Sequence, residues 1–169
     1  RLGDVEILKD FLKKYNKVNI DKKFGTFNSL NTASSLGHIK IVELLIENGA
    51  DVNANKDYPA LWSTSISGHY KIAALLIKHG ADINAKSIAG DTALHAASAA
   101  GHDRIVKLLI LKGSKINLLN NKNQTPLDYA IELGEKNIAN FLIDKGGKYG
   151  SIHSASFAGD LNAIREFIA

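Results

Sequence analysis

The chain has 169 residues and a mass of 18.3 kDa, which fits one compact domain or one short array of repeats and excludes a large multidomain enzyme. Hydrophobic residues make up 45% of the sequence and charged residues 22%, so the chain is expected to fold in water rather than to be disordered. The absence of cysteine excludes disulfide frameworks, thiolate zinc sites and cysteine nucleophiles, and the formal net charge of +4 is spread along the chain, which indicates solubility rather than nucleic-acid binding.

Four glycines set a regular spacing along the chain. Gly37, Gly68, Gly101 and Gly134 lie 31, 33 and 33 residues apart, and each begins a phrase of glycine, often histidine, and an aliphatic run. The first phrase reads GHIKIVELLIENGADVN and the third reads GHDRIVKLLILKGSKIN. A fixed period of 20–50 residues is typical of repeat architectures, so the sequence predicts an array of repeats rather than a single compact domain.

Each phrase is predicted to form one helix. In the third phrase Ile105, Leu108 and Leu109 recur at helical spacing, which indicates a helix of about eight to ten residues, roughly 12–15 Å long. A second glycine follows each phrase glycine after twelve residues, at Gly49, Gly80, Gly113 and Gly146. We expect these glycines just beyond the helix end, where a positive φ lets the trailing amides reach the last carbonyls.

A shorter helix, rich in small residues, is predicted upstream of each phrase, as in residues 92–100 and 125–133. Thr125 is placed to cap the second of these, with Pro126 at the first helical position, where a missing N–H costs nothing. The segments between units are too short for another helix and predict extended, turn-bearing connections. They are residues 51–55, 82–86 and 115–119. Because two short helices cannot bury their apolar faces alone, neighbouring units must stack and share a core.

The repeated phrase resembles that of the ankyrin repeat family, which is approximately G-x-T-P-L-H-x-A-A-x-x-G-H-x-x-I-V-x-x-L-L-x-x-G-A-D-V-N. It is matched nearly in full by Gly90, Thr92, Leu94, His95, Ala97, Gly101, His102, Ile105, Val106, Leu108, Leu109, Gly113 and Asn117. Residues 125–142 match it again, and residues 37–53 and 68–84 match its second half. The resemblance covers essentially the whole chain. It implies an all-α solenoid of stacked ankyrin repeats, in which helix pairs carry β-hairpin or loop fingers and enclose a concave face.

The period predicts a single ankyrin-repeat domain over residues 1–169. Its expected parts are a partial repeat at 1–21, repeats at 22–54, 55–86, 87–119 and 120–149, and a partial repeat at 150–169 that lacks a preceding hairpin. Both ends fall inside a repeat, so we expect a fragment or the ordered part of something longer.

Two units depart from the family pattern. Gly134 and Gly159 are 25 residues apart rather than 33, so a finger is predicted to be absent between Gly146 and Ser151. The stack could continue across a tight loop there or change its angle. In the unit that follows Pro59, Trp62 replaces the family's histidine, and we expect it in the core.

The histidines are expected to be structural. His38, His69 and His102 follow the repeat glycine, whereas His95 and His153 occupy the histidine slot of the T-P-L-H phrase. In that slot, the resemblance implies, the side chain ties a helix start to neighbouring backbone. The sequence has no H-x-x-x-H pair and no cysteine, so we predict no metal site and no cofactor.

The usual catalytic patterns are missing from the sequence. No serine stands in G-x-S-x-G, no nucleophile is paired with an oriented base, and no carboxylate pair suits acid–base work. The segment Gly146–Ser151 does not fit the phosphate-loop pattern either. We therefore expect no enzyme activity within this segment.

The resemblance also places the candidate contact residues, which in ankyrin domains lie at hairpin tips and on the exposed face of the first helix. By register, the hairpin positions are Phe27, Tyr58, Ile88, Asp91, Asn121, Lys122 and Gln124. The helix positions are Ser35, Leu36, Ile66, Ser67, Ala99, Glu132 and Leu133. Leu36, Ile66 and Leu133 are apolar where exposure is predicted, which is typical of an interface centre. The alternative is that these residues pack under their own hairpins or against flanking repeats.

The predicted function is non-catalytic protein–protein interaction through the concave face and the hairpin tips. We expect a protein partner of unknown identity, no small-molecule substrate, no nucleic acid, no membrane span, a monomer and a cytoplasmic location. The alternative is a targeting or substrate-recognition arm of a longer enzyme or of a secreted effector, which would act in a host cytoplasm. A third interpretation, a basic module for nucleic acid or acidic lipid, predicts binding that weakens steeply with salt.

Overall fold

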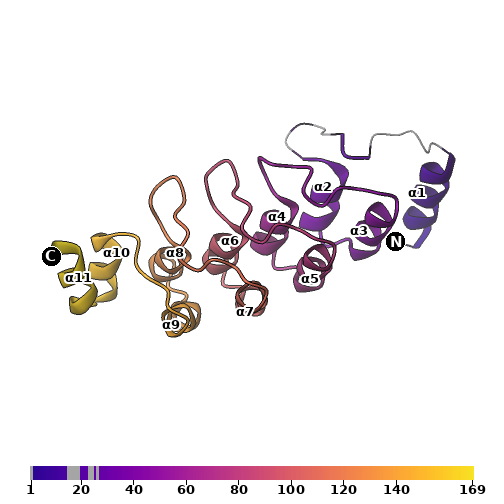
Figure 1. The fold of residues 1–169 in the computed structure, drawn as a ribbon. Coiled ribbons are helices and arrows are strands. Elements are labelled where there is room, and N and C mark those ends of the chain that lie inside the picture. The colour runs from indigo at the N-terminus through magenta and orange to yellow at the C-terminus, as the bar shows by residue number, and fades with distance from the viewer. Residues whose placement is uncertain (1, 15–19, 23–24, 26) are drawn as a thin grey trace.

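The computed structural model describes residues 2–14, 20–22, 25 and 27–169, and these residues form helices and no β-strand (Figure 1). The helices are α1 (Leu2–Lys14), α2 (Ser29–Ser35), α3 (Ile39–Glu47), α4 (Ala60–Ser67), α5 (Tyr70–Lys78), α6 (Ala93–Ala99), α7 (Asp103–Leu111), α8 (Pro126–Glu132), α9 (Lys136–Asp144), α10 (Ile152–Ala158) and α11 (Leu161–Ile168). After α1 the helices come in antiparallel pairs that stack in chain order, which confirms the predicted all-α solenoid. Residues 15–19 of the predicted partial repeat at 1–21, and residues 23, 24 and 26 before the predicted hairpin position Phe27, lie outside the described residues.

The first helix of each pair begins at a polar cap in four of the five pairs. Asn28, Thr92, Thr125 and Ser151 each accept the backbone N–H three residues further on, which satisfies one of the free amides at a helix start. Pro126 stands at the first helical position after Thr125, as predicted. The first helices and the fingers above them form one side of the stack in Figure 1, and α3, α5, α7 and α9 form a lower row.

The second helices have the predicted length and the predicted end. Each of α3, α5, α7 and α9 has nine residues. The glycines that follow them, Gly49, Gly80, Gly113 and Gly146, all have a positive φ between 85° and 92°. The residue after each of these glycines donates its backbone N–H to a carbonyl inside the preceding helix.

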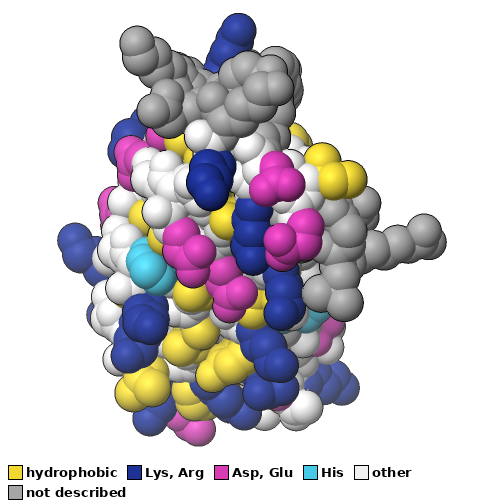
Figure 2. Space-filling view, turned by 90° about the vertical axis from the view of Figure 1, so that its right-hand side faces the viewer, with side chains coloured by type: hydrophobic (Ala, Val, Ile, Leu, Met, Phe, Trp, Pro, Cys, Tyr) yellow, Lys and Arg dark blue, Asp and Glu magenta, His cyan; other side chains and the backbone are white. Residues whose placement is uncertain are grey.

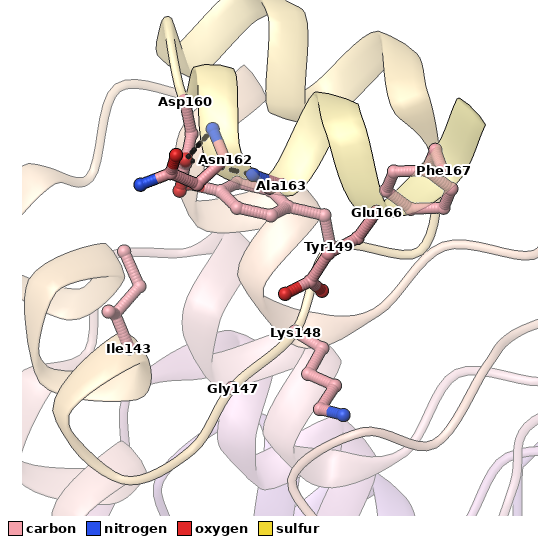
Figure 3. Close-up of a pocket in the computed structure, with 9 residues that line it drawn as sticks. All are labelled: Ile143, Gly147, Lys148, Tyr149, Asp160, Asn162, Ala163, Glu166 and Phe167. Carbon is pink, nitrogen blue, oxygen red and sulfur yellow. Dashed lines mark hydrogen bonds between the residues drawn. The ribbon is translucent and has the colours of Figure 1, made fainter. Parts of the chain in front are cut away.

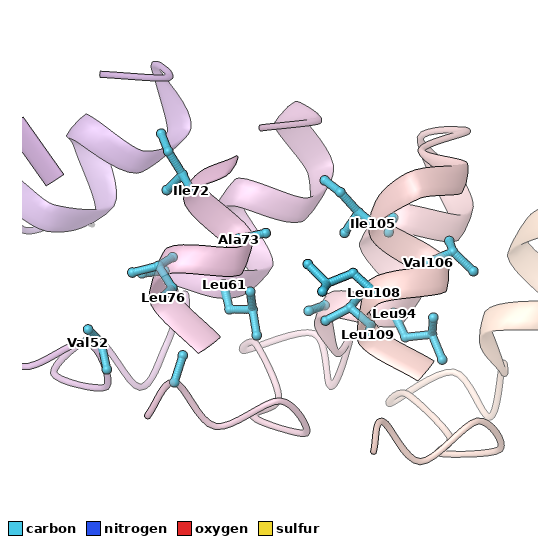
Figure 4. Close-up of a cluster of buried hydrophobic side chains, with 14 of the residues drawn as sticks. Val52, Leu61, Ile72, Ala73, Leu76, Leu94, Ile105, Val106, Leu108 and Leu109 are labelled. Carbon is cyan, nitrogen blue, oxygen red and sulfur yellow. The ribbon is translucent and has the colours of Figure 1, made fainter. Parts of the chain in front are cut away.

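The core runs without a break from α2 to α9. Leu61, Leu76, Leu94 and Leu109 are fully buried and belong to one cluster that extends from Leu30 to Leu142. Figure 4 shows side chains of neighbouring helices meeting within this cluster. Alanines at the first-helix faces, such as Ala97, let these helices approach closely. No pair could bury such faces alone, which is why the units depend on one another.

In α2 and α6, the side chain three residues after the cap ties neighbouring units together. Asn31 donates from Nδ2 to the Tyr58 carbonyl over 2.6 Å, and His95 Nε2 lies 3.1 Å from the Gln124 carbonyl. His95 Nδ1 accepts the Thr92 N–H over 3.1 Å, so Nε2 carries the proton and donates. Burial lowers the pKa of His95, which favours this neutral form.

The last connection has no finger. Residues 145–151 pass directly from α9 to α10, and Asp128, which occupies the His95 slot in α8, accepts the Gly150 N–H over 2.9 Å. The connection is also held by Thr125, whose hydroxyl donates to the Lys148 carbonyl over 2.9 Å. In Figure 1, α11 lies beside α10 and does not continue the lower row that ends at α9, so the stack changes its course at this joint.

The predicted slot for His153 was wrong. Ser151 caps α10 and bonds the Ser154 N–H, so Ser154 stands where His95 stands after Thr92. His153 is exposed, and its side chain forms no hydrogen bond with the described residues. The reason is one missing residue: eight residues separate the cap Ser151 from Gly159, against nine from Thr92 to Gly101. Counting back from the glycine therefore gave the wrong register at the cap.

Candidate functional site

Two tight fingers project from the first-helix side of the stack. Ser87 donates its N–H to the Asp91 carbonyl over 2.8 Å, and Asn120 does the same to Gln124 over 3.0 Å, so each finger closes on itself. The candidate contact residues Ile88, Asn121 and Lys122 are exposed at the tips.

Successive fingers are also bonded to one another. The Ile88 N–H donates to the Asp57 carbonyl over 2.8 Å, and the Asn121 N–H donates to the Ala89 carbonyl over 3.1 Å. Asn121 adds a side-chain bond from Nδ2 to the Ile88 carbonyl over 3.0 Å. The tips therefore form a continuous polar edge in which each position is fixed by its neighbour.

Gly90 makes the close approach of two fingers possible. Its φ is +80°, and a Cβ at this position would lie 2.7 Å from the Asn121 backbone nitrogen. The equivalent position in the next finger is Asn123, with φ of 58°, in a conformation that asparagine tolerates better than most residues. No finger follows Asn123, so a side chain fits there.

The fingers and first helices of the first half carry an aromatic cluster. The rings of Phe27 and Tyr58 meet edge to face at 5.6 Å, and Trp62 lies 5.8 Å from Tyr58. All three side chains are partly buried. Trp62 was predicted to lie in the core, but it is only half-buried, and its indole nitrogen has no hydrogen-bond partner among the described residues. Tyr58 contacts both of the other rings, and each of the three side chains keeps part of its surface exposed.

The same surface in the second half is polar and hydrogen-bonded. Asn120 donates from Nδ2 to Asp91 over 2.8 Å, and the Tyr129 hydroxyl lies 3.5 Å from the other Asp91 oxygen. Gln124 donates to both carboxylate oxygens of Glu132, over 3.0 and 3.1 Å. Burial and the nearby Asp91 carboxylate raise the pKa of Tyr129, so this hydroxyl stays protonated and can donate. The structure thus brings three of the predicted site residues, Asp91, Gln124 and Glu132, into one network.

The predicted helix positions do not form a single apolar strip. Leu36, Ile66 and Leu133 are 60%, 44% and 56% exposed, but α6 separates Ile66 from Leu133 and offers the half-buried Ala99 at the equivalent place. Ser67 and Glu132 are exposed, and Ser35 is half-buried. Leu36 borders a groove of about 290 Å³ together with Phe27, so these two residues share one surface.

Two backbone carbonyls at these positions are already occupied. His69 Nε2 lies 3.0 Å from the Ser35 carbonyl, and His102 Nε2 lies 3.2 Å from the Ile66 carbonyl. The His69 ring also covers Gly37, and the His102 ring covers Gly68. A Cβ on either glycine would lie within 2.7 Å of the histidine ring. His69 and His102 therefore join one unit to the next, which agrees with the structural role expected of them, and only the side chains at Ser35 and Ile66 are available for contact.

Three residues of this surface were not among the predicted contacts. Asn120 and Tyr129 hold the polar network together, and Trp62 completes the aromatic cluster. Their positions follow the repeat, so the register could have located them. The sequence pattern cannot show that Trp62 and Tyr129, each about one helical turn beyond a finger, contact residues of that finger.

Two other features are absent from the described residues. They contain no group of three or more histidine, aspartate or glutamate side chains that could hold a metal ion. Among them, no helix is both long and apolar enough to cross a membrane.

Comparison with known proteins agrees with the architecture. A family model described as ankyrin repeats, in three copies, matches residues 1–87 and again residues 86–153. No individual curated protein matches the chain. The family match spans most of the sequence, and it coincides with the helix pairs, the fingers and the repeat glycines described above. The chain therefore belongs to the ankyrin repeat family.

Proposed function

We propose that the chain is a non-catalytic protein-binding module whose contact surface is the concave face with its finger tips. Ankyrin repeats are generally protein–protein interaction modules, and fold alone does not fix the partner. The observation that carries the proposal is the aromatic cluster of Phe27, Tyr58 and Trp62, which lies beside the exposed Leu36 side chain. Partly exposed aromatic side chains in an apolar cluster are typical of the residues that dominate binding energy.

The finger network supports the same proposal, because it presents a preformed surface. The bonds from Ile88 to Asp57 and from Asn121 to Ala89 hold the tips in one arrangement before any partner arrives. A rigid surface loses little conformational entropy on association, so its contacts contribute more fully to affinity. The proposed contact residues keep the predicted set, with Trp62 and Tyr129 added.

The charge distribution favours a protein partner over nucleic acid. In the end-on view of Figure 2, lysine and arginine side chains share the surface with aspartate and glutamate rather than forming a patch of one sign. The polar half of the concave face carries the carboxylates of Asp91 and Glu132, which would repel phosphate. We further propose a monomer that acts in the cytoplasm, which fits a sequence without cysteine.

An affinity capture with three matched baits tests this proposal. The wild-type chain is compared with a variant that carries Leu36→Gln, Ile66→Gln and Leu133→Gln, and with a control that carries Ile7→Gln and Leu111→Gln, at exposed apolar residues outside the proposed surface. We expect a protein that is retained by the wild type and the control and lost by the triple variant. Retention of every captured protein by the triple variant would contradict a binding role for the concave face.

A further inference from the structure

The irregular joint opens a cleft on the side of the molecule formed by the second helices. A cleft of about 530 Å³ lies between α9 and α11, where the lower row of helices ends (Figure 3). A second groove of about 400 Å³ runs between α8, α9 and α10, and both are lined by Ile143 and Tyr149. Volumes of this size are typical of sites that bind small ligands or single side chains of a partner.

The walls of the cleft are apolar and aromatic. Ile143 of α9 and Phe167 of α11 are each 45% exposed, and the half-buried Tyr149 ring stands between them. At the regular joints, the equivalent faces of neighbouring second helices pack against each other. Here the missing finger moves α11 out of the row, so these faces stay open.

The charge in the cleft is negative. Asp160 and Glu166 both line it. Asp160 caps α11 and lies 3.3 Å from the Tyr149 hydroxyl, whereas Glu166 forms no ion pair or hydrogen bond with the described residues. Figure 3 shows the Glu166 carboxylate directed into the cleft, and it shows the Lys148 amine pointing away from it. Among the described residues, the Glu166 carboxylate therefore has no cation as a partner.

The cleft is held in shape by the connection beneath it. Asn117 accepts the Lys148 N–H over 2.7 Å, Thr125 donates to the Lys148 carbonyl, and Asp128 accepts the Gly150 N–H. These bonds fix the backbone on both sides of Tyr149. A preformed site of this kind requires little ordering when a partner binds.

We propose that this cleft is a second docking site, separate from the concave face, that accepts a basic segment of a protein partner. One arginine or lysine side chain of that segment lies between the rings of Tyr149 and Phe167 and pairs with Glu166. A neighbouring aliphatic or aromatic side chain covers Ile143. Cations are attracted to aromatic faces and form their strongest hydrogen bonds with carboxylates, and the cleft presents both groups together.

Selection of binding peptides tests the proposal. A phage-displayed library of random twelve-residue peptides is selected on the 169-residue chain, and the recovered peptides are measured by fluorescence anisotropy. We expect a class of peptides with arginine or lysine beside an apolar residue. The Kd of this class is expected to rise at least tenfold for Glu166→Gln and for Ala163→Trp, which fills the cleft. It is also expected to rise at least tenfold when the basic residue of the peptide is replaced by glutamine.

Two controls separate this proposal from the concave-face function. Arg165→Gln changes a charge on the same helix, at a residue that does not line the cleft, and is expected to change the Kd less than twofold. The Leu36, Ile66 and Leu133 triple variant is also expected to leave this class bound. The proposal is overturned if no recovered peptide loses affinity for Glu166→Gln, or if the glutamine-substituted peptides bind as tightly as their parents. Since Glu166 is exposed, its substitution is not expected to affect folding, and helix content by circular dichroism checks this.

Discussion

The joint between α6 and α8 and the joint between α8 and α10 differ in the direction of one hydrogen bond. Between α6 and α8, the slot residue His95 donates to a carbonyl, that of Gln124. Between α8 and α10, the slot residue Asp128 accepts from an N–H, that of Gly150. The first joint is followed by a finger and the second is not. At each of these two joints the slot side chain therefore matches the backbone group of the next unit. The slot residue is a donor, His95, where a finger is present and an acceptor, Asp128, where the finger is missing.

The irregular joint keeps one regular feature. Asn84 accepts the Lys115 N–H over 2.8 Å at a regular connection, and Asn117 accepts the Lys148 N–H over 2.7 Å at the irregular one. The polypeptide therefore leaves α9 along the usual path and departs from it after Lys148, within the three residues before α10. What is lost is the finger and the alignment of α11 with the lower row.

Truncation of a buried leucine should have the largest effect. Leu108 of α7 is buried in the shared core, so Leu108→Ala should lower the free energy of unfolding by about 2–5 kcal/mol, measured by urea denaturation. Ile164 of α11 is only half-buried, and Ile164→Ala should cost less than about 2 kcal/mol. Equal losses would mean that the last helix pair is packed as tightly as the others.

A side chain at Gly90 should affect the regular joint in two ways. Gly90→Ala would strain a backbone with φ of +80° and would also push the Cβ against Asn121, so we expect a loss of about 3 kcal/mol. Gly159 has φ of +74° with open space around it, so Gly159→Ala should cost only the backbone strain, about 1–2 kcal/mol. Thermal denaturation of both variants measures the difference between the two losses of stability. Equal losses would show that the fingers do not pack against each other at Gly90.

The acceptor at the irregular joint can be tested by removing its charge. The buried Asp128 carboxylate accepts the Thr125 N–H and the Gly150 N–H, so Asp128→Asn should weaken the joint by about 1–3 kcal/mol. Hydrogen exchange should then become faster in α10 and α11 while the rates in α4–α7 stay unchanged. Glu132→Gln, an exposed carboxylate on the same helix, is the control. Faster exchange throughout the chain would show that the last pair is not a separate unit.

Much of this architecture could be predicted because it repeats. The glycine period, the capping Thr125 and the nine-residue second helices all follow from local rules that act in every unit. The register failed at His153, where one deletion between cap and glycine made two ways of counting disagree. The path of α11 could not be predicted, because it depends on how Asp128 and Gly150 meet across 22 residues.

The candidate surface was predictable in position but not in character. The register placed Phe27, Tyr58, Asp91 and Gln124 at equivalent points of successive units. It did not show that the first two join an aromatic cluster and the last two a hydrogen-bonded network. That difference arises from residues one helical turn away, Trp62 and Tyr129, which belong to different slots of the repeat.

Acid should weaken the regular joint by a smaller amount, through His95. Burial lowers the pKa of His95 below its ordinary value near 6.5, so between those two values the unfolded chain binds more protons than the folded one. The stabilisation that depends on neutral His95 is therefore complete above about pH 6.5 and is lost as the pH falls through the lowered pKa. His95→Asn places in α6 the same side chain that Asn31 provides in α2, where it donates to the carbonyl of the next unit without titrating. The melting temperature of the wild type should fall more than that of His95→Asn between pH 7.5 and pH 5, and because the other histidines are common to both proteins, parallel curves would show that His95 does not titrate with unfolding.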